Sequence, residues 1–389
     1  MSTCIHSVRL VDAGRKVEDA WVRFEGGRVA ATGIGESWRR FAQPHDAVVD
    51  GAQLGGPGAV LTPGFLDIHG HGGGGASYDD GPESIRTARA LHRAHGTTRA
   101  VISLVSAPVE TLAQRAAMVA GLTETDADIL GSHLEGPFLA PGHKGAHEEA
   151  LLRAPEPAPL DLLLEAGRGT IRQMTLAPEL PGGLHAVRAV VAAGAAAAIG
   201  HTGADLERTR EAIAAGATIL THAFNAMPGL HHRDPGPVGA ASSDPRVILE
   251  IIADGVHLHP EIIRVVFAAA PGRIALVTDA MAAAGGGDGH YELGSLAVRV
   301  EDGVARLADG GAIAGSTLTQ DAALRHTVQA GVPLAEAVRA LTATPARAIG
   351  RGDDLGSLAV GAIADAVLLT DELEVRSVWT AGVAEAPRP

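Results

Sequence analysis

Five stretches of this 389-residue chain end an apolar run with a histidine or an acidic residue. They are Asp67-Ile68-His69-Gly70-His71, His133-Leu134-Glu135-Gly136-Pro137, Gly200-His201-Thr202, Thr221-His222-Ala223-Phe224-Asn225 and Val277-Thr278-Asp279-Ala280. Imidazole nitrogens and carboxylate oxygens bind zinc and similar divalent ions, and the same groups carry out acid–base catalysis. A (β/α)8 barrel places its catalytic groups at the carboxyl ends of several different strands. Together, the five stretches predict a metal-dependent hydrolase.

The candidate metal ligands fall into two sets. Glu135, His201 and His222 would form a three-ligand site that leaves one position open for water, as catalytic zinc sites do. His69 and His71 are two residues apart at an expected strand end, where residues i and i+2 point to the same face, so both rings can reach one ion. Each residue also has an alternative when it is taken alone. His69 and His71 could be a pair of loop histidines, Glu135 could be a surface glutamate in a turn, and His201 and His222 could be structural histidines. The repetition of the pattern favours metal binding.

Asp279 ends the last apolar run and is the candidate for proton transfer. Hydrolysis at a metal requires a group that accepts the proton of the attacking water and delivers it to the leaving group. A carboxylate that faces the metal meets this requirement. The alternative is an N-cap for a helix that begins at Ala280.

Arg233 is the main candidate for binding an anion, because a guanidinium group can hydrogen-bond a phosphate through two nitrogens. The backbone around Asn225 and Ala226 could add donors, and His257 could assist. For Arg233 the alternative is a surface ion pair with Asp234, its neighbour in the sequence.

The elements that must position these residues alternate between strand and helix. Apolar runs of strand length lie at residues 64–68, 99–105, 129–133, 172–176, 196–200, 218–222, 247–252 and 274–278. Helical patterns, such as those at residues 83–92 and 205–213, separate most of them. Strand–helix alternation predicts a parallel sheet, and eight repeats predict its closure into a barrel.

Both ends of the chain read instead as short strands joined by turns. We therefore predict an α/β protein in which residues 61–354 form a TIM-type (β/α)8 barrel. Residues 1–60 and 355–389 would together form a small β-sandwich domain. A hairpin is expected at residues 293–307, after the last barrel strand, and helices are expected at 317–330 and 334–342.

The composition argues against several other classes of protein. A net charge of −14 without a basic run argues against a nucleic-acid partner. Cys4 is the only cysteine, which excludes disulfides and cysteine-based zinc sites. The N-terminus has no signal-peptide pattern, and the longest apolar stretch is shorter than the roughly 20 residues that span a bilayer. We expect a soluble, cytoplasmic protein without a membrane partner. Lys16 and Lys144 are the only lysines in the sequence. Neither of them ends an expected strand, so a carbamylated lysine between two metals is not expected.

Longer motifs around these residues resemble the amidohydrolase superfamily and, within it, the N-acetylglucosamine-6-phosphate deacetylases. The most specific are Glu135-Gly136-Pro137-Phe138, Lys144-Gly145-Ala146-His147 and Asn225-Ala226-Met227. Further matches are Leu176-Ala177-Pro178-Glu179, Asp254-Gly255-Val256-His257, Ala314-Gly315-Ser316 and Pro345-Ala346-Arg347-Ala348. The resemblance covers nearly the whole chain, in order.

The resemblance implies a role for each matching residue. Glu135, His201 and His222 would bind the principal metal, and His69 and His71 would bind a second metal in members that have one. The implied catalytic residues are His147, which would polarise the acetyl carbonyl, and Asp279, the acid–base. The implied ligands of the sugar phosphate are Asn225, Ala226, Arg233 and His257. A homodimer is also implied, with Arg233 reaching the site of the neighbouring subunit.

The implied reaction is hydrolysis of the acetamide of N-acetylglucosamine 6-phosphate to glucosamine 6-phosphate and acetate, in amino-sugar catabolism and cell-wall sugar recycling. The cofactor would be one or two divalent ions per subunit, with Zn, Fe, Mn and Co all compatible with these ligands. One alternative is deacetylation of another sugar phosphate, such as N-acetylgalactosamine 6-phosphate. Another is an amidase of the same superfamily that acts on a cyclic amide or an N-acyl amino acid. A non-catalytic barrel scaffold is disfavoured, because all of the ligands are present.

Overall fold

Parallel strands of the larger sheet lie side by side in the order β15-β14-β13-β12-β11-β10-β9-β6. Their bounds are β6 (Phe65–Asp67), β9 (Thr97–Val105), β10 (Ile129–Glu135), β11 (Ile171–Leu176), β12 (Ala196–Ile199), β13 (Ile219–Leu220), β14 (Ile248–Ile252) and β15 (Ile274–Val277). Just past the two outermost strands, the backbone N–H of Asp279 donates to the carbonyl of His69 at 2.9 Å. The sheet therefore closes on itself, and the predicted (β/α)8 TIM-type barrel is confirmed.

The barrel strands are buried along nearly their whole length and are mostly apolar, because both of their faces are covered. Every residue of β9 and every residue of β10 is buried. Strands in parallel sheets that are covered on both faces read as continuous hydrophobic runs rather than alternating ones. This property is the reason that all eight strands were recognisable in the sequence.

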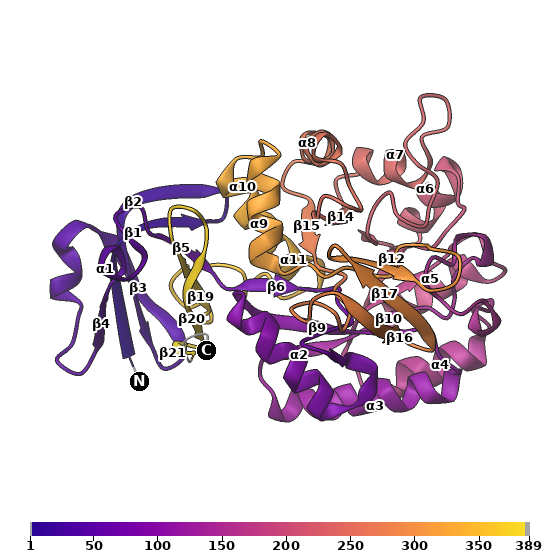
Figure 1. The fold of residues 1–389 in the computed structure, drawn as a ribbon, viewed down its shortest axis with the longest axis horizontal. Helices are drawn as coiled ribbons and strands as arrows, with labels where there is room; N and C mark the ends of the chain where they lie inside the picture. The colour runs from indigo at the N-terminus through magenta and orange to yellow at the C-terminus, as the bar shows by residue number, and fades with distance from the viewer. Residues whose placement is uncertain (1, 386–389) are drawn as a thin grey trace. The chain divides into compact units, whose positions relative to one another are not determined.

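Helices connect the strands and surround them in Figure 1. They are α2 (Pro82–Ala94), α3 (Val109–Thr125), α4 (Pro157–Ala166), α5 (Gly183–Ala192), α6 (Leu206–Ala214), α7 (Gly236–Ser243) and α8 (Pro260–Ala269). Side chains cap the first turns of α6 and α8. Asp205, for example, caps α6 by accepting a hydrogen bond from the backbone N–H of Arg208. Three more helices follow along the chain: α9 (Gln320–Gln329), α10 (Leu334–Leu341) and α11 (Ala343–Ala348).

An antiparallel sheet is inserted after β15. It consists of β16 (Gly289–Leu293), β17 (Leu296–Glu301) and β18 (Val304–Leu307). The predicted hairpin corresponds to β17 and β18, joined at Asp302 and Gly303, whose positive φ angles of 51° and 74° suit a tight two-residue turn. The prediction missed β16. Of its five residues, Gly-His-Tyr-Glu-Leu, only Leu293 is buried, so the sequence shows no apolar run or alternation that would predict a strand.

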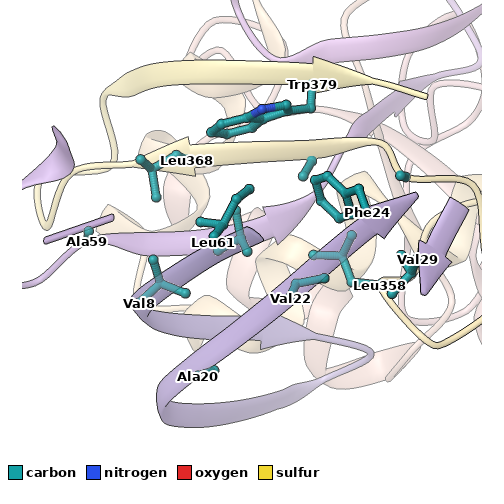
Figure 2. Close-up of a cluster of buried hydrophobic side chains, with 13 residues drawn as sticks. Val8, Ala20, Val22, Phe24, Val29, Ala59, Leu61, Leu358, Leu368 and Trp379 are labelled. Atoms are coloured by element: carbon teal, nitrogen blue, oxygen red, sulfur yellow. The ribbon is translucent and has the colours of Figure 1, made fainter. Parts of the chain in front are cut away.

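The smaller sheet combines both ends of the chain, as predicted. Its strands are β1 (Ser2–Asp12), β2 (Arg15–Glu25), β3 (Arg28–Ile34), β4 (Ala47–Asp50), β5 (Val60–Pro63), β19 (Ala366–Leu369), β20 (Val375–Thr380) and β21 (Val383–Ala384). β5 pairs with β19 in antiparallel register, with Leu61 opposite Leu368. Figure 2 shows Phe24 and Trp379 in the same buried cluster.

Short elements complete the chain: β7 (Gly72–Gly73), β8 (Ala76–Ser77), α1 (Gly51–Gly55) and the 3-10 turns η1 (Gly35–Arg40), η2 (Tyr78–Asp80), η3 (Pro141–His143) and η4 (Glu149–Leu151). The computed structural model describes residues 2–385. None of the helices in this part of the chain is both long and apolar enough to cross a membrane.

Two compact units can be separated within the described residues. One takes in both chain ends and His92–Arg99, and the other comprises Ile68–Leu91 and Ala100–Thr319. Every residue for which chemistry was predicted lies in the second unit. The domain boundaries placed after residue 60 and before residue 355 stay a prediction.

Candidate active site

The carboxylate of Glu135, the last residue of β10, lies at the centre of a cluster of imidazole rings. Its Oε1 atom is 3.2 Å from the Nε2 atoms of both His201 and His222, and these two nitrogens are 3.0 Å apart. All three side chains are buried. Nitrogen and oxygen ligands about 2.0–2.1 Å from one tetrahedral ion are separated from each other by about 3.3 Å. The predicted ligands of the principal metal therefore have separations that suit a single ion.

A second group of donors adjoins the first. The Oδ1 atom of Asp279 lies 3.3 Å from His71 Nε2 and 3.5 Å from His69 Nε2. The other Glu135 oxygen, Oε2, is 3.1 Å from His71 Nε2. The donor atoms of His69, His71 and Asp279 all lie within 4.8 Å of one another. Glu135 thus contacts both sets of predicted ligands.

The carboxylates make the cluster favourable for positive charge. Burial lowers the pKa of His71, but hydrogen bonds to Asp279 and Glu135 raise it to about 9. The pKa of His69 is likewise raised well above its ordinary value, because the charges of Glu135 and Asp279 outweigh burial. A divalent cation can supply the same positive charge while the imidazoles stay neutral, the form in which they bind metals. The donor set fits one or two such ions.

Four of the ligand and acid–base candidates lie at the same distance beyond a strand. His69, His201, His222 and Asp279 each stand two residues past the last residue of their strand. Of these, His201, His222 and Asp279 have positive φ angles of 47°, 27° and 48°. Such angles are rare outside glycine and collect at functional sites. After β12, β13 and β15, a left-handed residue thus carries the side chain that joins the cluster at the barrel mouth.

A cavity of about 260 Å³ opens above the cluster. Its wall includes Asn225, Ala226 and His257, three of the residues predicted to hold a sugar phosphate. Leu293 and Ile313, from the inserted sheet and the segment after it, also line the cavity. Two larger surface cavities, of about 590 and 580 Å³, contain none of the predicted site residues.

The pKa values of His147 and His257 are shifted in opposite directions. Burial lowers the pKa of His147 to about 4, so this ring is neutral near neutral pH and has one N–H to donate. Its Nε2 atom lies 3.5 Å from Glu135 Oε2. Burial also acts to lower the pKa of His257, but the ion pair between His257 Nδ1 and Asp254 Oδ2, at 2.7 Å, raises it overall. The raised pKa favours the protonated form of this ring in the wall of the cavity, which would suit an anionic group.

Residues 60–384 match the amidohydrolase family. The chain belongs to the amidohydrolase family. The resemblance inferred from the sequence motifs is therefore confirmed. The family is metal-dependent, and the buried donor groups around Glu135 and Asp279 are where this amidohydrolase could bind ions.

Relatives cover nearly all of this amidohydrolase. The N-acetylgalactosamine-6-phosphate deacetylase of Escherichia coli O157:H7 is 41% identical over 83% of this chain and 87% of its own length. The N-acetylglucosamine-6-phosphate deacetylase of Homo sapiens is 36% identical over 96% of this chain and 93% of its own length. A solved structure of a mutant N-acetyl-D-glucosamine-6-phosphate deacetylase from Mycobacterium smegmatis, in complex with N-acetyl-D-glucosamine-6-phosphate, has a TM-score of 0.91 at 40% identity. That match covers 98% of this chain and 99% of the other, so the similarity extends through both units.

The fold brings together all of the predicted site residues of this amidohydrolase except Arg233. Arg233 is exposed in the loop between β13 and α7 and is not among the residues that line the cavity. The loop begins beside the cavity, at Asn225 and Ala226, and moves away from it before Arg233 is reached.

Two acidic residues near the site were given no role by the sequence reasoning, although Glu179 belongs to one of the matching motifs. Glu250 is completely buried on β14 and contacts His69. The sequence did contain an indication of a role for Glu250, because it is the one acidic residue in the otherwise apolar strand β14. Glu179 accepts hydrogen bonds from the Thr202 hydroxyl and the Gly203 backbone N–H, both at 2.6 Å, and so anchors the turn that contains His201. No spacing rule links Glu179 to that turn in the sequence.

Proposed function

We propose that this amidohydrolase hydrolyses the acetamide of N-acetylglucosamine 6-phosphate to acetate and glucosamine 6-phosphate. The observation that carries the proposal is the juxtaposition of Glu135, His201 and His222 with Asp279 and His147 around one cavity. This arrangement combines a metal-binding set, a base and a hydrogen-bond donor, which hydrolysis of an amide requires. We infer the identity of the substrate from the relatives, which are deacetylases of N-acetylated hexosamine 6-phosphates.

In this proposal Glu135, His201 and His222 hold the principal divalent ion, and His69 and His71 hold a second. A bound ion would acidify water and polarise the acetyl carbonyl. Zn, Fe, Mn and Co all suit these nitrogen and oxygen donors.

Asp279 acts as the base and then as the acid. Burial raises the pKa of Asp279, but the neighbouring His69 and His71 lower it more strongly, so the carboxylate is ionised at neutral pH. It can therefore accept the proton of the attacking water and later give it to the departing amine. The neutral ring of His147 donates a hydrogen bond to the acetyl oxygen, on which negative charge develops.

The phosphate would be held at the opposite end of the cavity from the acetyl group. Asn225 and Ala226 supply polar backbone and amide groups, and His257, whose pKa is raised by Asp254, supplies positive charge when it is protonated. Arg233 takes part from a neighbouring subunit of a homodimer, which agrees with its exposure within a single chain. We place this homodimer in the cytoplasm.

Acetate release tests the reaction. We would compare N-acetylglucosamine 6-phosphate with unphosphorylated N-acetylglucosamine and with N-acetylgalactosamine 6-phosphate, on protein supplied with divalent metal. The galacto substrate is the second candidate, because the relative from Escherichia coli O157:H7 deacetylates it. Faster release from the gluco phosphate than from the other two sugars is expected. Equal rates with and without the phosphate would contradict the anion site, and no release by metal-loaded protein would contradict the proposed reaction.

A further inference from the structure

Glu250 is a buried acid that the proposed reaction does not use. It is completely inaccessible to solvent, in the middle of β14, and its neighbours along that strand are isoleucine and leucine. An ionised carboxylate in such surroundings costs several kcal/mol unless hydrogen bonds or an opposite charge compensate it. The partners of Glu250 should therefore indicate its role.

Three donors surround the carboxylate. Its Oε2 atom lies 3.1 Å from His69 Nδ1 and accepts a longer bond, of 3.4 Å, from the backbone N–H of His222. Its Oε1 atom accepts a hydrogen bond of 2.8 Å from the side-chain amide of Gln173. Among these partners, His69 alone can carry a positive charge. The contact between Glu250 and His69 is thus the one that joins the carboxylate to the predicted second metal group.

The contact determines which nitrogen of His69 can bind an ion. A neutral imidazole carries hydrogen on one nitrogen only. Because Nδ1 donates to Glu250, the lone pair is left on Nε2, which faces Glu135 at 3.3 Å and Asp279 at 3.5 Å. A carboxylate that accepts from the far nitrogen of a metal-binding histidine fixes the ring orientation and makes the near nitrogen a stronger ligand.

We propose that Glu250 is a positioning residue for the ion held by His69, His71 and Asp279. It holds Nε2 of His69 toward that ion, and its buried negative charge offsets part of the charge of the ion. Glu250 touches no side chain of the principal set of Glu135, His201 and His222, and it reaches only the backbone of His222. Loss of the carboxylate should therefore affect one ion much more than the other. The inference rests on the metal-dependent site proposed above, but not on the sugar that the site acts on.

The test is to count ions in Glu250→Leu, which removes the acceptor while keeping an apolar side chain of similar size. Cobalt would be titrated into metal-free protein, with its absorption bands and the cobalt content per chain as readouts. The wild-type chain should bind two ions. Glu250→Leu should keep the first ion and bind the second at least 10-fold more weakly, since partners of this kind are worth about 10–100-fold in metal affinity.

The matched control is Thr175→Val, an isosteric change that removes a buried hydroxyl group in the barrel interior. The hydrogen-bond partners of this hydroxyl are His133 and Thr221, and not Glu250 or His69. It should retain both ions. If Glu250→Leu does not fold, as judged by circular dichroism, Glu250→Gln keeps the side-chain shape and an acceptor oxygen but removes the negative charge, and it should also bind the second ion more weakly than wild type while keeping the first.

Three outcomes would overturn the inference. They are a wild-type chain that binds a single ion, a Glu250 variant with unchanged affinity for both ions, and a variant that loses both ions in parallel while Thr175→Val keeps them. Because no sugar enters these titrations, a failure of acetate release in wild-type protein that still binds two ions would count against the proposed substrate and leave this inference intact.

Discussion

The Nε2 atoms of His201 and His222 face each other across 3.0 Å, although the two residues follow different strands. Two ring nitrogens at this distance repel each other if both carry a hydrogen or if neither does. A shared proton relieves the repulsion, and so does a divalent ion that accepts both lone pairs. The pair therefore predicts that metal binding stabilises the folded chain as well as supporting catalysis.

Removal of the metal should inactivate and destabilise the protein. A ligand present at about 100 times its dissociation constant stabilises the native state by about 2.7 kcal/mol. We expect a chelator to abolish acetate release and to lower the melting temperature, and we expect added divalent ion to restore both. His222→Ala should show the low melting temperature without chelator. Full turnover in protein shown to be free of metal would contradict this prediction.

Asp279→Asn should lower kcat by at least about 10²-fold, because acid–base groups usually contribute about 10²–10⁴-fold. The amide has nearly the same shape as the carboxylate but cannot accept the proton of the attacking water. Metal analysis should still find the principal ion, since Glu135, His201 and His222 are unchanged. Near-normal turnover in this variant would remove Asp279 from the proposed role.

Arg233→Ala should raise the KM for the phosphorylated sugar by about 10-fold or more, the usual value of a hydrogen bond to a charged group. Activity on unphosphorylated N-acetylglucosamine should be unaffected. Arg210→Ala is the control, because Arg210 is also exposed, on α6, where it pairs with Glu207. An unchanged KM in Arg233→Ala, or an equal rise in both variants, would argue against a phosphate contact by Arg233.

Asp79 should make stability depend on pH. Burial raises its pKa from 3.8 to about 6 in the folded chain, although the Arg115 side chain lies 2.9 Å away. Between these values the folded state retains a proton that the unfolded state has lost. The contribution of Asp79 is therefore present below pH 3.8 and is lost as the pH rises through 6. Asp79→Asn should gain stability relative to wild type over this range, by about 1.4 kcal/mol per pH unit and up to about 3 kcal/mol.

Urea unfolding at pH 4 and pH 7 measures this difference. The exposed neighbour Asp80 provides the control variant Asp80→Asn, which makes the same substitution at the surface instead of at the buried position. A constant difference for Asp79→Asn would refute the assignment.

Asp365→Ala should be strongly destabilising. In the unit formed by the chain ends, the guanidinium of Arg99 donates to both oxygens of Asp365, at 2.6 and 2.9 Å, and both side chains are buried. Removing one partner of a buried ion pair leaves an uncompensated charge and costs about 3–5 kcal/mol. Glu207→Ala, which breaks the exposed pair with Arg210, should cost less than about 1 kcal/mol. Similar losses in the two variants, measured by urea unfolding, would contradict this prediction.

Much of the fold could be predicted because each buried barrel strand forms a local apolar run in the sequence. A strand that is covered on both faces is mostly apolar, so β9 and β10 were visible as apolar runs of strand length that contain few polar residues. The predicted ligands were visible for a related reason, since each of them interrupts apolar sequence at or just past a strand end. β16 was not predicted because backbone pairing with β17 holds it in place. Its sequence therefore needs no run of apolar side chains, and only Leu293 is buried.

The sequence by itself determined the succession of strands and helices along the chain, the side chains able to bind a metal, and the family to which the chain belongs. The tertiary structure decided which of those side chains meet, because distances across the barrel depend on how separate strands pack. The 3.0 Å approach of His201 to His222 joins residues 21 positions apart, and Glu250 reaches His69 across 181 positions. Local sequence patterns report which face of an element is buried, but contacts over such separations arise only when the sheet closes. Arg233 carries the right chemistry for a phosphate, and it is the folded loop that leaves it outside the cavity of its own chain.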